Sequence, residues 1–426
     1  MLESKEVYQL HAEQHYALDR IQKLEGVVFL TGKAGTGKST LLNLIKRTFR
    51  INMIVLAPTG VASVLVGGQT IHSFFKFPPG WISQKDYKPL SKSMAEKIDL
   101  IVIDEISMVR ADILDHMDQL LKLSKKKDKP FGGIPMLWVG DLYQLPPVVS
   151  SPEEKAYFEH HYTSPYFFSA NVMKELDSFE LIELEQVFRQ NELHFIRLLN
   201  RIRLNECDEE DLDEINQRAQ ADPTEDGLPA ITLTSTNVQA NQINLKELNK
   251  LDTSPKTYSA IMEGSINPSQ FPAEQHLILK VGAQIMTLRN DPAKNFINGS
   301  IGILEELMPQ SIRVKFPSQE SSVEIPMATW EIVRYIYEDQ TIKVNPVGSF
   351  TQLPVKLAWA VTIHKSQGKT FDKAIIDLGR GAFENGQTYV ALSRCRTLDG
   401  VYLTQKLQWK DVRTDERVAD FIRQWR

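Results

Sequence analysis

The segment GKAGTGKS, residues 32–39, combines spaced glycines with a lysine and a serine. It follows an apolar run that predicts a buried strand and precedes a predicted helix, which is the context that a phosphate-binding loop requires. Glycines let backbone N–H groups close around phosphates, and the start of the helix adds a favourable dipole. We therefore expect Lys38 to contact the β- and γ-phosphates of ATP and Ser39 to ligand Mg²⁺. The other predicted nucleotide contacts of this loop are Gly32, Gly35, Thr36, Gly37 and Thr40.

Two acidic residues end a second apolar run, LIVIDEIS, at Asp104 and Glu105. At the end of a buried strand, one carboxylate can hold Mg²⁺ while its neighbour polarises the water that attacks the phosphate. An apolar run that ends in two acids is only moderately specific alone. Behind a complete phosphate loop, it predicts Asp104 as a metal ligand and Glu105 as the catalytic base.

Two glutamines extend the predicted nucleotide site. In VGDLYQLPPV a predicted strand ends near Gln144, which is placed to sense the γ-phosphate or the attacking water, although a plain turn with prolines is the alternative. Gln14 in LHAEQ is the predicted reader of the adenine edge. Gln9 and Gln22 are its rivals for that role.

Arginines in the second half of the chain point to a second lobe. LEQVFRQ carries Arg189, and YVALSRCR carries Arg394 and Arg396. Arginines that reach a γ-phosphate from a facing lobe stabilise the charge of the transition state. They also make closure of the lobes depend on the phosphate, which would convert hydrolysis into movement. A single arginine is more often a surface salt-bridge residue, so these gain weight only from the surrounding motifs.

Turns at the ends of predicted strands carry small polar residues suited to phosphate and sugar contacts. They are APTGVA (57–62), LTSTN (233–237) and AWAVTIHKSQGKTFD (358–372). Each alone is a turn or helix cap at least as often as a nucleic-acid contact. Together they predict matching clamps on one strand, with Thr362, His364 and Lys365 as contacts and Gly368 close to the nucleotide.

The elements that must position these residues form an α/β pattern. Apolar runs at 27–30, 54–56, 100–103 and 136–139 alternate with helical stretches and predict a doubly wound parallel sheet. Runs at 357–361, 374–376 and 401–403 predict a second α/β lobe. Within the second lobe, alternating apolar residues and the hairpin signal Asn298-Gly299 predict an inserted β-barrel or meander. Near the end, an apolar face predicts a helix within 413–426 that docks onto the second lobe.

A small insertion at about 64–80 interrupts the first lobe. The rings of Phe74, Phe75, Phe77 and Trp81 stand beside prolines and a glycine in and just after it. Such rings could stack on bases or could anchor the excursion to the core, and the sequence does not separate these readings. Phe74 is the candidate base contact of this insertion.

The bulk composition sets limits. The net charge of −5 gives no global basic footprint, so a nucleic-acid track would need a local cleft. No apolar run approaches a membrane-spanning length, and the first residues resemble neither a secretory nor a transit signal. Cys207 and Cys395 make no metal or disulfide framework, as in a reducing compartment. We expect a cytoplasmic, bacterial-type, nucleoid-associated protein with no membrane partner.

Taken in order, GKAGTGKS, APTGVA, IDEIS, GDLYQLPPV, LEQVFRQ, TIHKSQGKT and YVALSRCR resemble the motifs of the Pif-family DNA helicases of superfamily 1B. MVRADILDHMDQLLK followed by PFGGIP is similar to a segment typical of that family, and RecD-like helicases are the nearest relatives. The resemblance spans nearly the whole chain.

This resemblance implies two RecA-like domains, with ATP between them and single-stranded DNA across their tops. It implies movement from 5′ to 3′, a wedge in the first insertion and an SH3-like barrel as the second. The corresponding domains are 1–180, 181–255 with 346–426, and the insertion 256–345. DNA junctions, G-quadruplexes and RNA–DNA hybrids are implied partners, and one chain holds a complete ATP site. The DNA contacts implied by motif match are Thr59, Gly60, His72, Ser235, Asn237, His364 and Lys365.

Three other functions remain open at this point. A translocase that does not separate strands would have the same ATP site but no working wedge. An ATP-gated clamp that holds DNA without cycling is disfavoured by the intact Lys38, Asp104 and Glu105. A metabolic P-loop kinase would leave the second lobe unexplained.

Overall fold

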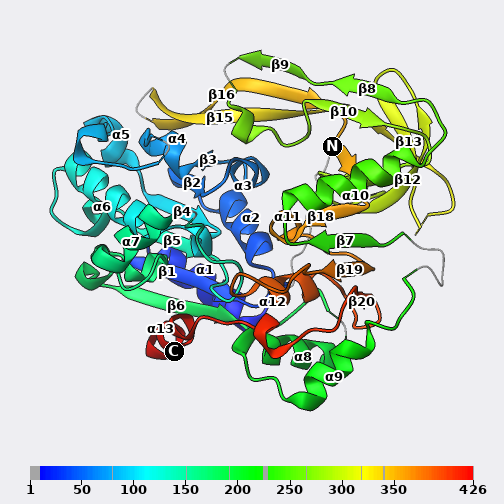
Figure 1. The fold of residues 1–426 in the computed structure, drawn as a ribbon. Helices are drawn as coiled ribbons and strands as arrows, with labels where there is room; N and C mark the ends of the chain where they lie inside the picture. The colour runs from blue at the N-terminus through cyan, green and yellow to red at the C-terminus, as the bar shows by residue number, and fades with distance from the viewer. Residues whose placement is uncertain are drawn as a thin grey trace.

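A parallel six-stranded sheet, in the order β3-β2-β4-β5-β1-β6, forms the centre of the N-terminal half in this computed structural model (Figure 1). Its strands are β1 (Val27–Gly32), β2 (Met53–Ala57), β3 (Gln69–Thr70), β4 (Leu100–Asp104), β5 (Met136–Val139) and β6 (Phe179–Leu184). The four predicted apolar runs lie in β1, β2, β4 and β5, which confirms them. The structure describes residues 10–78, 80–149, 151–190, 192–223, 229–264, 266–317, 319–338 and 341–425.

Helices cover both faces of this sheet because alternate strand residues point to opposite sides. Phe29 of β1 packs into one core cluster with α6, whereas its neighbours Val28 and Leu30 pack into another with α1 and α2. The helices of this half are α1 (Ala12–Gln22), α2 (Lys38–Thr48), α3 (Gly60–Leu65), α4 (Ile71–Phe75), α5 (Lys92–Lys97), α6 (Ala111–Lys125) and α7 (Pro152–His161).

A second sheet, β18-β7-β19-β20, is also parallel. Its strands are β7 (Ile231–Thr234), β18 (Ala360–Thr362), β19 (Ala374–Asp377) and β20 (Val401–Leu403). The predicted runs at 374–376 and 401–403 are confirmed as β19 and β20. The helices of the C-terminal half are α8 (Leu193–Leu204), α9 (Glu209–Gln217), α10 (Asn237–Asn249), α11 (Ile363–Ser366), α12 (Gln387–Leu392) and α13 (Glu416–Trp425).

The apolar run at 357–361 was predicted to form one strand, but the structure divides it between two. Its first residue ends β17 (Val355–Leu357), which pairs with β11 in an antiparallel sheet, and its last residues lie in β18 of the second parallel sheet. Since residue 345 falls inside β16 and residue 180 inside β6, two predicted domain limits cut through strands.

The strands between α10 and β18 are antiparallel and form three sheets, β14-β13-β12-β11-β17, β15-β16-β9 and β10-β8. The SH3-like form stays a prediction, although Ile312, Val314 and Phe316 are buried in one cluster as their alternation suggests. The strands are β8 (Lys256–Ser259), β9 (Ile261–Gly264), β10 (His276–Leu279), β11 (Gln284–Thr287), β12 (Ile301–Leu307), β13 (Ser311–Lys315), β14 (Val323–Pro326), β15 (Ala328–Glu338) and β16 (Thr341–Gln352).

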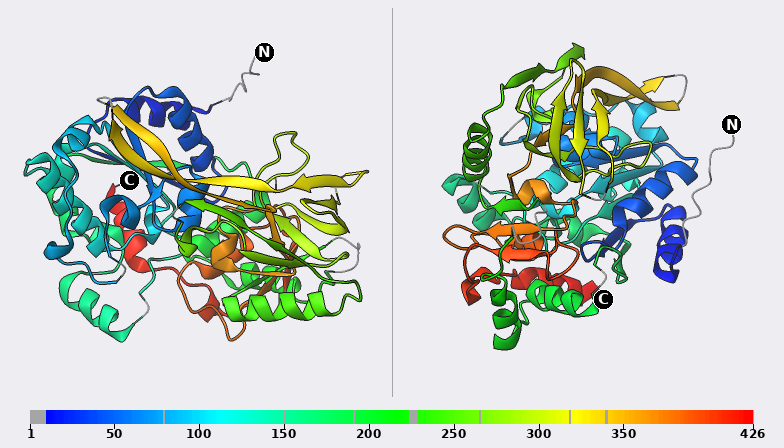
Figure 2. Two further views of the ribbon diagram at one scale, coloured as in Figure 1. Left: turned by 90° about the horizontal axis from the view of Figure 1, so that it is seen from above. Right: turned by 90° about the vertical axis from the view of Figure 1, so that its right-hand side faces the viewer.

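The hairpin of β15 and β16 crosses from the inserted strands to the first lobe (Figure 2). There β15 packs near β3, α3 and α5. The short 3₁₀ helices of the chain are η1 (Gln84–Asp86), η2 (Ile106–Met108), η3 (Pro130–Gly133), η4 (Phe167–Ser169), η5 (Asn171–Glu175), η6 (Pro268–Gln270) and η7 (Trp409–Asp411).

The C-terminal helix α13 docks onto the first lobe, which corrects the predicted docking onto the second. Phe421 stacks on Phe168 with ring centroids 4.6 Å apart, and Trp425 meets Phe179 of β6 edge-on at 4.6 Å. The predicted apolar face is right, because Val418, Phe421 and Ile422 are buried. An amphipathic pattern shows that a helix has a buried face, but it does not show which surface covers it.

Candidate active site

A cavity of about 520 Å³ opens between the two parallel sheets. The first half contributes the phosphate loop, Glu105 and Gln144, and the second contributes Gly368 and Arg394. The structure therefore brings together residues far apart in sequence. The predicted residues that line the cavity are Gln14, Gly35, Thr36, Gly37, Lys38, Ser39, Thr40, Glu105, Gln144, Arg189, Gly368 and Arg394. Gly32 and Asp104 end β1 and β4 behind this lining.

The phosphate loop runs from β1 into α2 through positive backbone angles. Gly35 and Gly37 both have a φ of 85°, where glycine is strongly favoured. A Cβ on Gly35 would lie 2.4 Å from the Cβ of Arg189, so the loop also needs glycine for close approach. The Nζ of Lys38 donates to the carbonyl oxygens of Gly32 at 2.6 Å and Lys33 at 2.9 Å. Burial lowers the pKa of Lys38, against the opposing effect of nearby acids.

The two predicted acids lie at the carboxyl end of β4. Glu105 has a φ of 54°, an uncommon conformation for a residue with a side chain and one that often marks functional sites. Burial, with the neighbouring charge of Asp104 as the second cause, raises the pKa of Glu105 to about 7. Burial also raises the pKa of Asp104. A half-buried carboxylate that lines the cavity beside the phosphate loop is suited to polarise a water molecule.

Ser39 and Asp104 fit a Mg²⁺ site by their chemistry and their position. A hydroxyl and a carboxylate are the hard oxygen ligands that this ion takes alongside waters and substrate phosphates. Ser39 lies in the first turn of α2 after β1, and Asp104 ends β4, so both stand at the carboxyl edge of one parallel sheet. Among the described residues no cluster of three or more His, Cys, Asp or Glu side chains offers another metal site.

Gln144 is held by its own turn beside the cavity. Its side-chain Nε2 donates to Oδ2 of Asp141 at 3.1 Å, and its side chain is buried. The carboxylate of Asp141 therefore positions the amide in the turn that follows β5.

Both candidate arginine fingers donate to backbone carbonyl oxygens of the second lobe. Arg189 donates weakly to the carbonyl oxygens of Ser393 at 3.5 Å and Gly368 at 3.4 Å. Arg394 is almost fully buried and donates its Nε to the carbonyl oxygen of Val390 at 2.8 Å. Burial, followed by the positive charge of Arg189, lowers the pKa of Arg394 to about 9. The partly exposed Arg189 beside the buried Arg394 makes this a favourable place for a polyphosphate.

Gln14 reaches the cavity, whereas its rival Gln22 is exposed at the far end of α1 and Gln9 lies outside the described residues. A Cβ on Gly37 would stand 3.3 Å from Nε2 of Gln14, which places the amide beside the loop. The sequence reasoning missed Phe188, whose half-exposed ring lines the same side of the cavity. Its place directly before Arg189 was the available signal. Leu10, Leu44, Thr370 and Arg396 also line the cavity.

The predicted nucleic-acid contacts lie at the carboxyl ends of strands in both sheets. Thr59 and Gly60 follow β2, Ser235 follows β7, and Lys365 follows β18. Several also serve locally: the hydroxyl of Thr59 caps α3, that of Ser235 donates to Leu378, and His364 pairs with Glu384 at 3.0 Å. Exposed side chains remain available at Thr59, Asn237 and Lys365, and His72 is partly exposed on α4.

Two of these predictions are corrected by burial. The side chain of Phe74 is only 5% exposed and packs edge-on against Phe75, so its ring anchors the insertion to the core. Phe75 and Phe77 are buried with it, and Trp81 is the exposed ring of this group. Thr362 is 3% exposed, and its hydroxyl accepts the N–H of Lys365 as the cap of α11. Neither side chain is open to a nucleic acid in this conformation.

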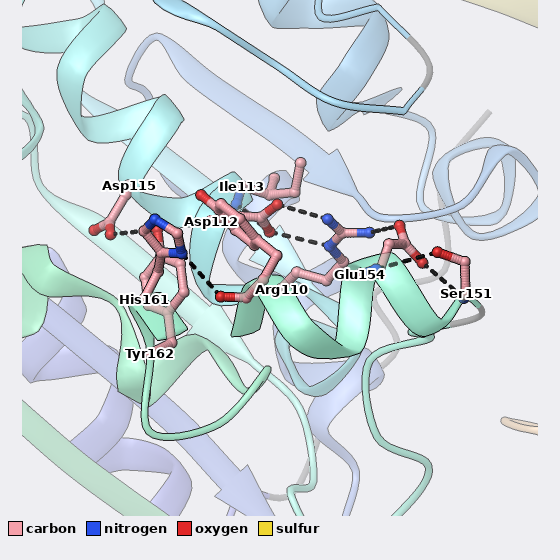
Figure 3. Close-up of polar contacts among 9 residues, drawn as sticks. Arg110, Asp112, Ile113, Asp115, Ser151, Glu154, His161 and Tyr162 are labelled. Carbon is pink, nitrogen blue, oxygen red and sulfur yellow. Dashed lines mark hydrogen bonds and ion pairs between the residues drawn. The ribbon is translucent and has the colours of Figure 1, made fainter. Parts of the chain in front are cut away.

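The segment that resembles a family signature forms α6, and an ion-pair network holds its start to α7 (Figure 3). Arg110 donates two bonds to Asp112, at 3.0 and 2.6 Å, and a third to Glu154 at 2.6 Å. One turn further, Asp115 accepts the hydroxyl of Tyr162 at 3.0 Å. These contacts join two helices beneath the exposed Trp81, whose ring meets Tyr157 of α7 at 4.7 Å.

Comparisons with known proteins agree on one family. Residues 9–213 match the model of the PIF1-like helicase family. The ATP-dependent DNA helicase Pif1 of Bdellovibrio bacteriovorus is 31% identical, over 98% of this chain and 92% of that protein. The chain spans between 63% and 67% of the length of several longer eukaryotic relatives.

Solved structures of a Bacteroides Pif1 helicase share the fold. A double mutant is similar with a TM-score of 0.90 and 36% identity, covering 97% of this chain and 96% of that one. A complex with ADP-AlF3 and single-stranded DNA gives 0.69 at 37% identity, covering 98% and 97%. Within the described ranges, every helix is too short or too polar to cross a membrane.

Proposed function

This chain belongs to the PIF1-like helicase family, and from that premise we propose that it is an ATP-dependent DNA helicase that moves 5′ to 3′ along single-stranded DNA and unwinds duplex. Its two parallel sheets are the RecA-like units of that family. The Bacteroides helicase structure with a nucleotide analogue and single-stranded DNA supports both ligands.

One observation carries the proposal: a single cavity is lined by catalytic groups from both lobes. Lys38 and Glu105 come from the first lobe, and Gly368 and Arg394 come from the second. A P-loop enzyme that only transferred phosphate would not need an arginine from a second parallel sheet. Because the nucleotide would contact both sheets, its hydrolysis would change how they fit together, as movement along a strand requires.

Within this cavity each residue has a proposed role. Lys38 and Arg394 hold the phosphates and stabilise the charge of the transition state, with Arg189 as a second finger. Glu105 polarises the water, and Gln144 senses the γ-phosphate. Ser39 and Asp104 would hold Mg²⁺, which would neutralise phosphate charge when bound. Gln14 reads the adenine edge.

The DNA path follows from the strand ends. The candidate DNA contacts of both lobes follow the carboxyl ends of strands in the two parallel sheets. They are Thr59, Gly60 and His72 on the first lobe and Ser235, Asn237, His364 and Lys365 on the second. We propose one single strand across both edges, with the first insertion as the wedge. Since Phe74, Phe75 and Phe77 are buried, Trp81 is the ring that such a wedge would present. The direction of movement, and action on G-quadruplexes or RNA–DNA hybrids, are supported by the motif resemblance.

The deciding experiment compares matched duplexes with a 5′ or a 3′ single-stranded tail, with ATP hydrolysis followed in the same reaction. Unwinding of the 5′-tailed duplex alone is the expected result. DNA-stimulated hydrolysis without unwinding would favour a translocase, and hydrolysis that DNA does not stimulate would refute the two-lobe mechanism. Lys38→Ala is the inactive control.

A second variant tests the wedge. Trp81→Ala should reduce unwinding while DNA-stimulated hydrolysis continues, because the side chain is 52% exposed and outside the ATP cavity. Trp409→Ala is the matched control, since Trp409 is 54% exposed on η7 of the other lobe. Equal unwinding by both variants would refute the role of Trp81.

A further inference from the structure

Arg203 is a buried cation that none of the sequence motifs contains. It lies near the end of α8, and its side chain is only 4% exposed. Its guanidinium stands 3.3 Å from Oδ1 of Asp141 and 3.6 Å from a carboxylate oxygen of Glu183, and it covers the ring of Tyr143 at 4.2 Å. Because a buried arginine is costly unless it is paired, these contacts fix its position.

Asp141 connects Arg203 to the candidate γ-phosphate sensor. The carboxylate of Asp141 is fully buried and accepts three bonds. They come from the guanidinium of Arg203 at 3.3 Å, the backbone N–H of Tyr143 at 3.2 Å and the side-chain Nε2 of Gln144 at 3.1 Å. The orientation of the Gln144 amide therefore depends on where Asp141 is held.

The second lobe packs closely against the turn that contains Tyr143 and Gln144. A Cβ at Gly386, the N-cap of α12, would lie 2.5 Å from the carbonyl oxygens of both Tyr143 and Gln144. Helix α8 packs against α12, and the carbonyl oxygen of Arg203 accepts the hydroxyl of Thr414 at 2.8 Å. Arg203 thus belongs to a helix that is attached to the second lobe, while its guanidinium holds a turn of the first.

We propose that Arg203 is a positioning residue for ATP hydrolysis: through Asp141 it sets the side chain of Gln144 and ties this setting to α8 and α12. It does not touch the nucleotide cavity itself, since it is absent from the lining. When α8 and α12 stand in their observed places, the Asp141 carboxylate holds Gln144 at the cavity. A shift of α8 would withdraw the cation that balances Asp141.

This inference rests on the proposed role of Gln144, so the experiment measures both. The experiment measures kcat and KM of DNA-stimulated ATP hydrolysis for Arg203→Lys, Gln144→Ala and the double variant. A lysine keeps the charge but cannot pair with Asp141 and Glu183 while stacking on Tyr143. The expected loss is about 10-fold in kcat for Arg203→Lys, with KM for ATP changed by less than about twofold, since the group acts on the transition state.

The double variant shows whether Arg203 acts on hydrolysis by positioning Gln144 or independently of it. If Arg203 acts through Gln144, Arg203→Lys should cost less than about twofold on top of Gln144→Ala. Losses that multiply would overturn the proposal. A normal Gln144→Ala beside a slow Arg203→Lys would also overturn it, while leaving the helicase function intact. An unstimulated wild-type enzyme would instead contradict the proposed function.

Two further variants guard against a folding defect. Arg201→Lys is the matched control on the same helix, because Arg201 is about a third exposed and pairs with Asp208 and Asp211 away from the cavity. It should leave kcat unchanged. Asp141→Asn preserves shape and should reproduce the kcat loss of Arg203→Lys, again without adding to Gln144→Ala. A normal kcat for Asp141→Asn would overturn the proposed link.

Discussion

The phenol oxygen of Tyr335, on the hairpin of the inserted strands, accepts the backbone N–H of Val55 in β2 at 3.0 Å. The backbone N–H of Tyr335 donates in turn to Oε1 of Gln69 at 3.0 Å. Because β3 pairs with β2 only at Leu56 and Ala57, Val55 has an open edge that the tyrosine satisfies. The hairpin is therefore bonded to the sheet that carries the phosphate loop.

Removing that hydroxyl should weaken the attachment measurably. Tyr335→Phe leaves the Val55 N–H without its partner and should lower the free energy of unfolding by about 1–3 kcal/mol. Urea titration measures the change. Tyr337→Phe is the control on the same strand, since Tyr337 has no hydroxyl bond among the described residues. Equal stability of the two variants would contradict the role of the bond.

Gly386 should be intolerant of any side chain. Gly386→Ala would force its Cβ against two carbonyl oxygens of the Gln144 turn, at 2.5 Å, and should impair DNA-stimulated ATP hydrolysis at least 10-fold. Gly379→Ala is the matched control, because Gly379 also has a positive φ, 61°, but has open space around its Cβ. It should cost about 1 kcal/mol of stability and leave hydrolysis intact. Comparable hydrolysis by both variants would show that the contact is unimportant.

Glu105→Gln should bind ATP and fail to turn it over. Loss of a general base typically costs about 10²–10⁴-fold in rate, whereas the amide keeps the shape of the site. Rapid-quench hydrolysis and a fluorescent-nucleotide binding titration report the two steps separately. Normal turnover by this variant would remove Glu105 from the mechanism.

DNA binding should weaken as the pH rises. Burial, with the nearby charges of Lys369 and Lys365, lowers the pKa of Lys356 to about 7, and burial lowers that of Lys369 to about 8. A lysine with a lowered pKa is charged below that pKa and neutral above it. Because Lys356 lies close enough to the proposed DNA contact Lys365 to be repelled by its charge, the affinity for single-stranded DNA should fall between about pH 6 and 9, as these amines lose their charge.

The lysine prediction is checked by fluorescence anisotropy at constant ionic strength. Lys356→Met should flatten the lower part of the pH dependence, whereas the exposed Lys92→Met on the first lobe should not. An unchanged pH profile for Lys356→Met would show that its amine does not contribute to binding.

Arg110→Ala should destabilise the first lobe. It leaves Asp112 and Glu154, which are 7% and 18% exposed, without their shared cation, and should cost about 2–4 kcal/mol. Thermal unfolding measures the loss. Lys92→Ala, which breaks an exposed pair with Glu96, should cost less than about 1 kcal/mol. Similar midpoints for both variants would contradict the structural role of Arg110.

Much of the first sheet was predictable because buried parallel strands are continuous apolar runs. Val27–Gly32 is buried at every position, and the phosphate loop beside it is a local pattern of glycines and one lysine. Strand β3 could not be predicted, because two residues carry no periodicity and gain their conformation from pairing with β2.

Contacts between distant segments escaped prediction for a different reason. Arg203 stands 62 residues from Asp141, and nothing near it in sequence marks it as more than a helical arginine. Phe74 shows the opposite error, because the sequence suggested a functional contact where the structure has a core residue. An aromatic cluster beside prolines suits base stacking as well as it suits a core. Only the packing of the whole lobe decides between the two.

Helix α13 returns the chain to the lobe in which β1 lies, so the second lobe is connected to the first at both of its ends. The backbone crosses from one sheet's unit to the other after β6 and crosses back before Glu416. The chain therefore connects the two units at two crossings, and the hairpin of β15 and β16 adds a third attachment at Val55. Full separation of the units would have to break the bond from Val55 to Tyr335 and strip Phe421 from Phe168.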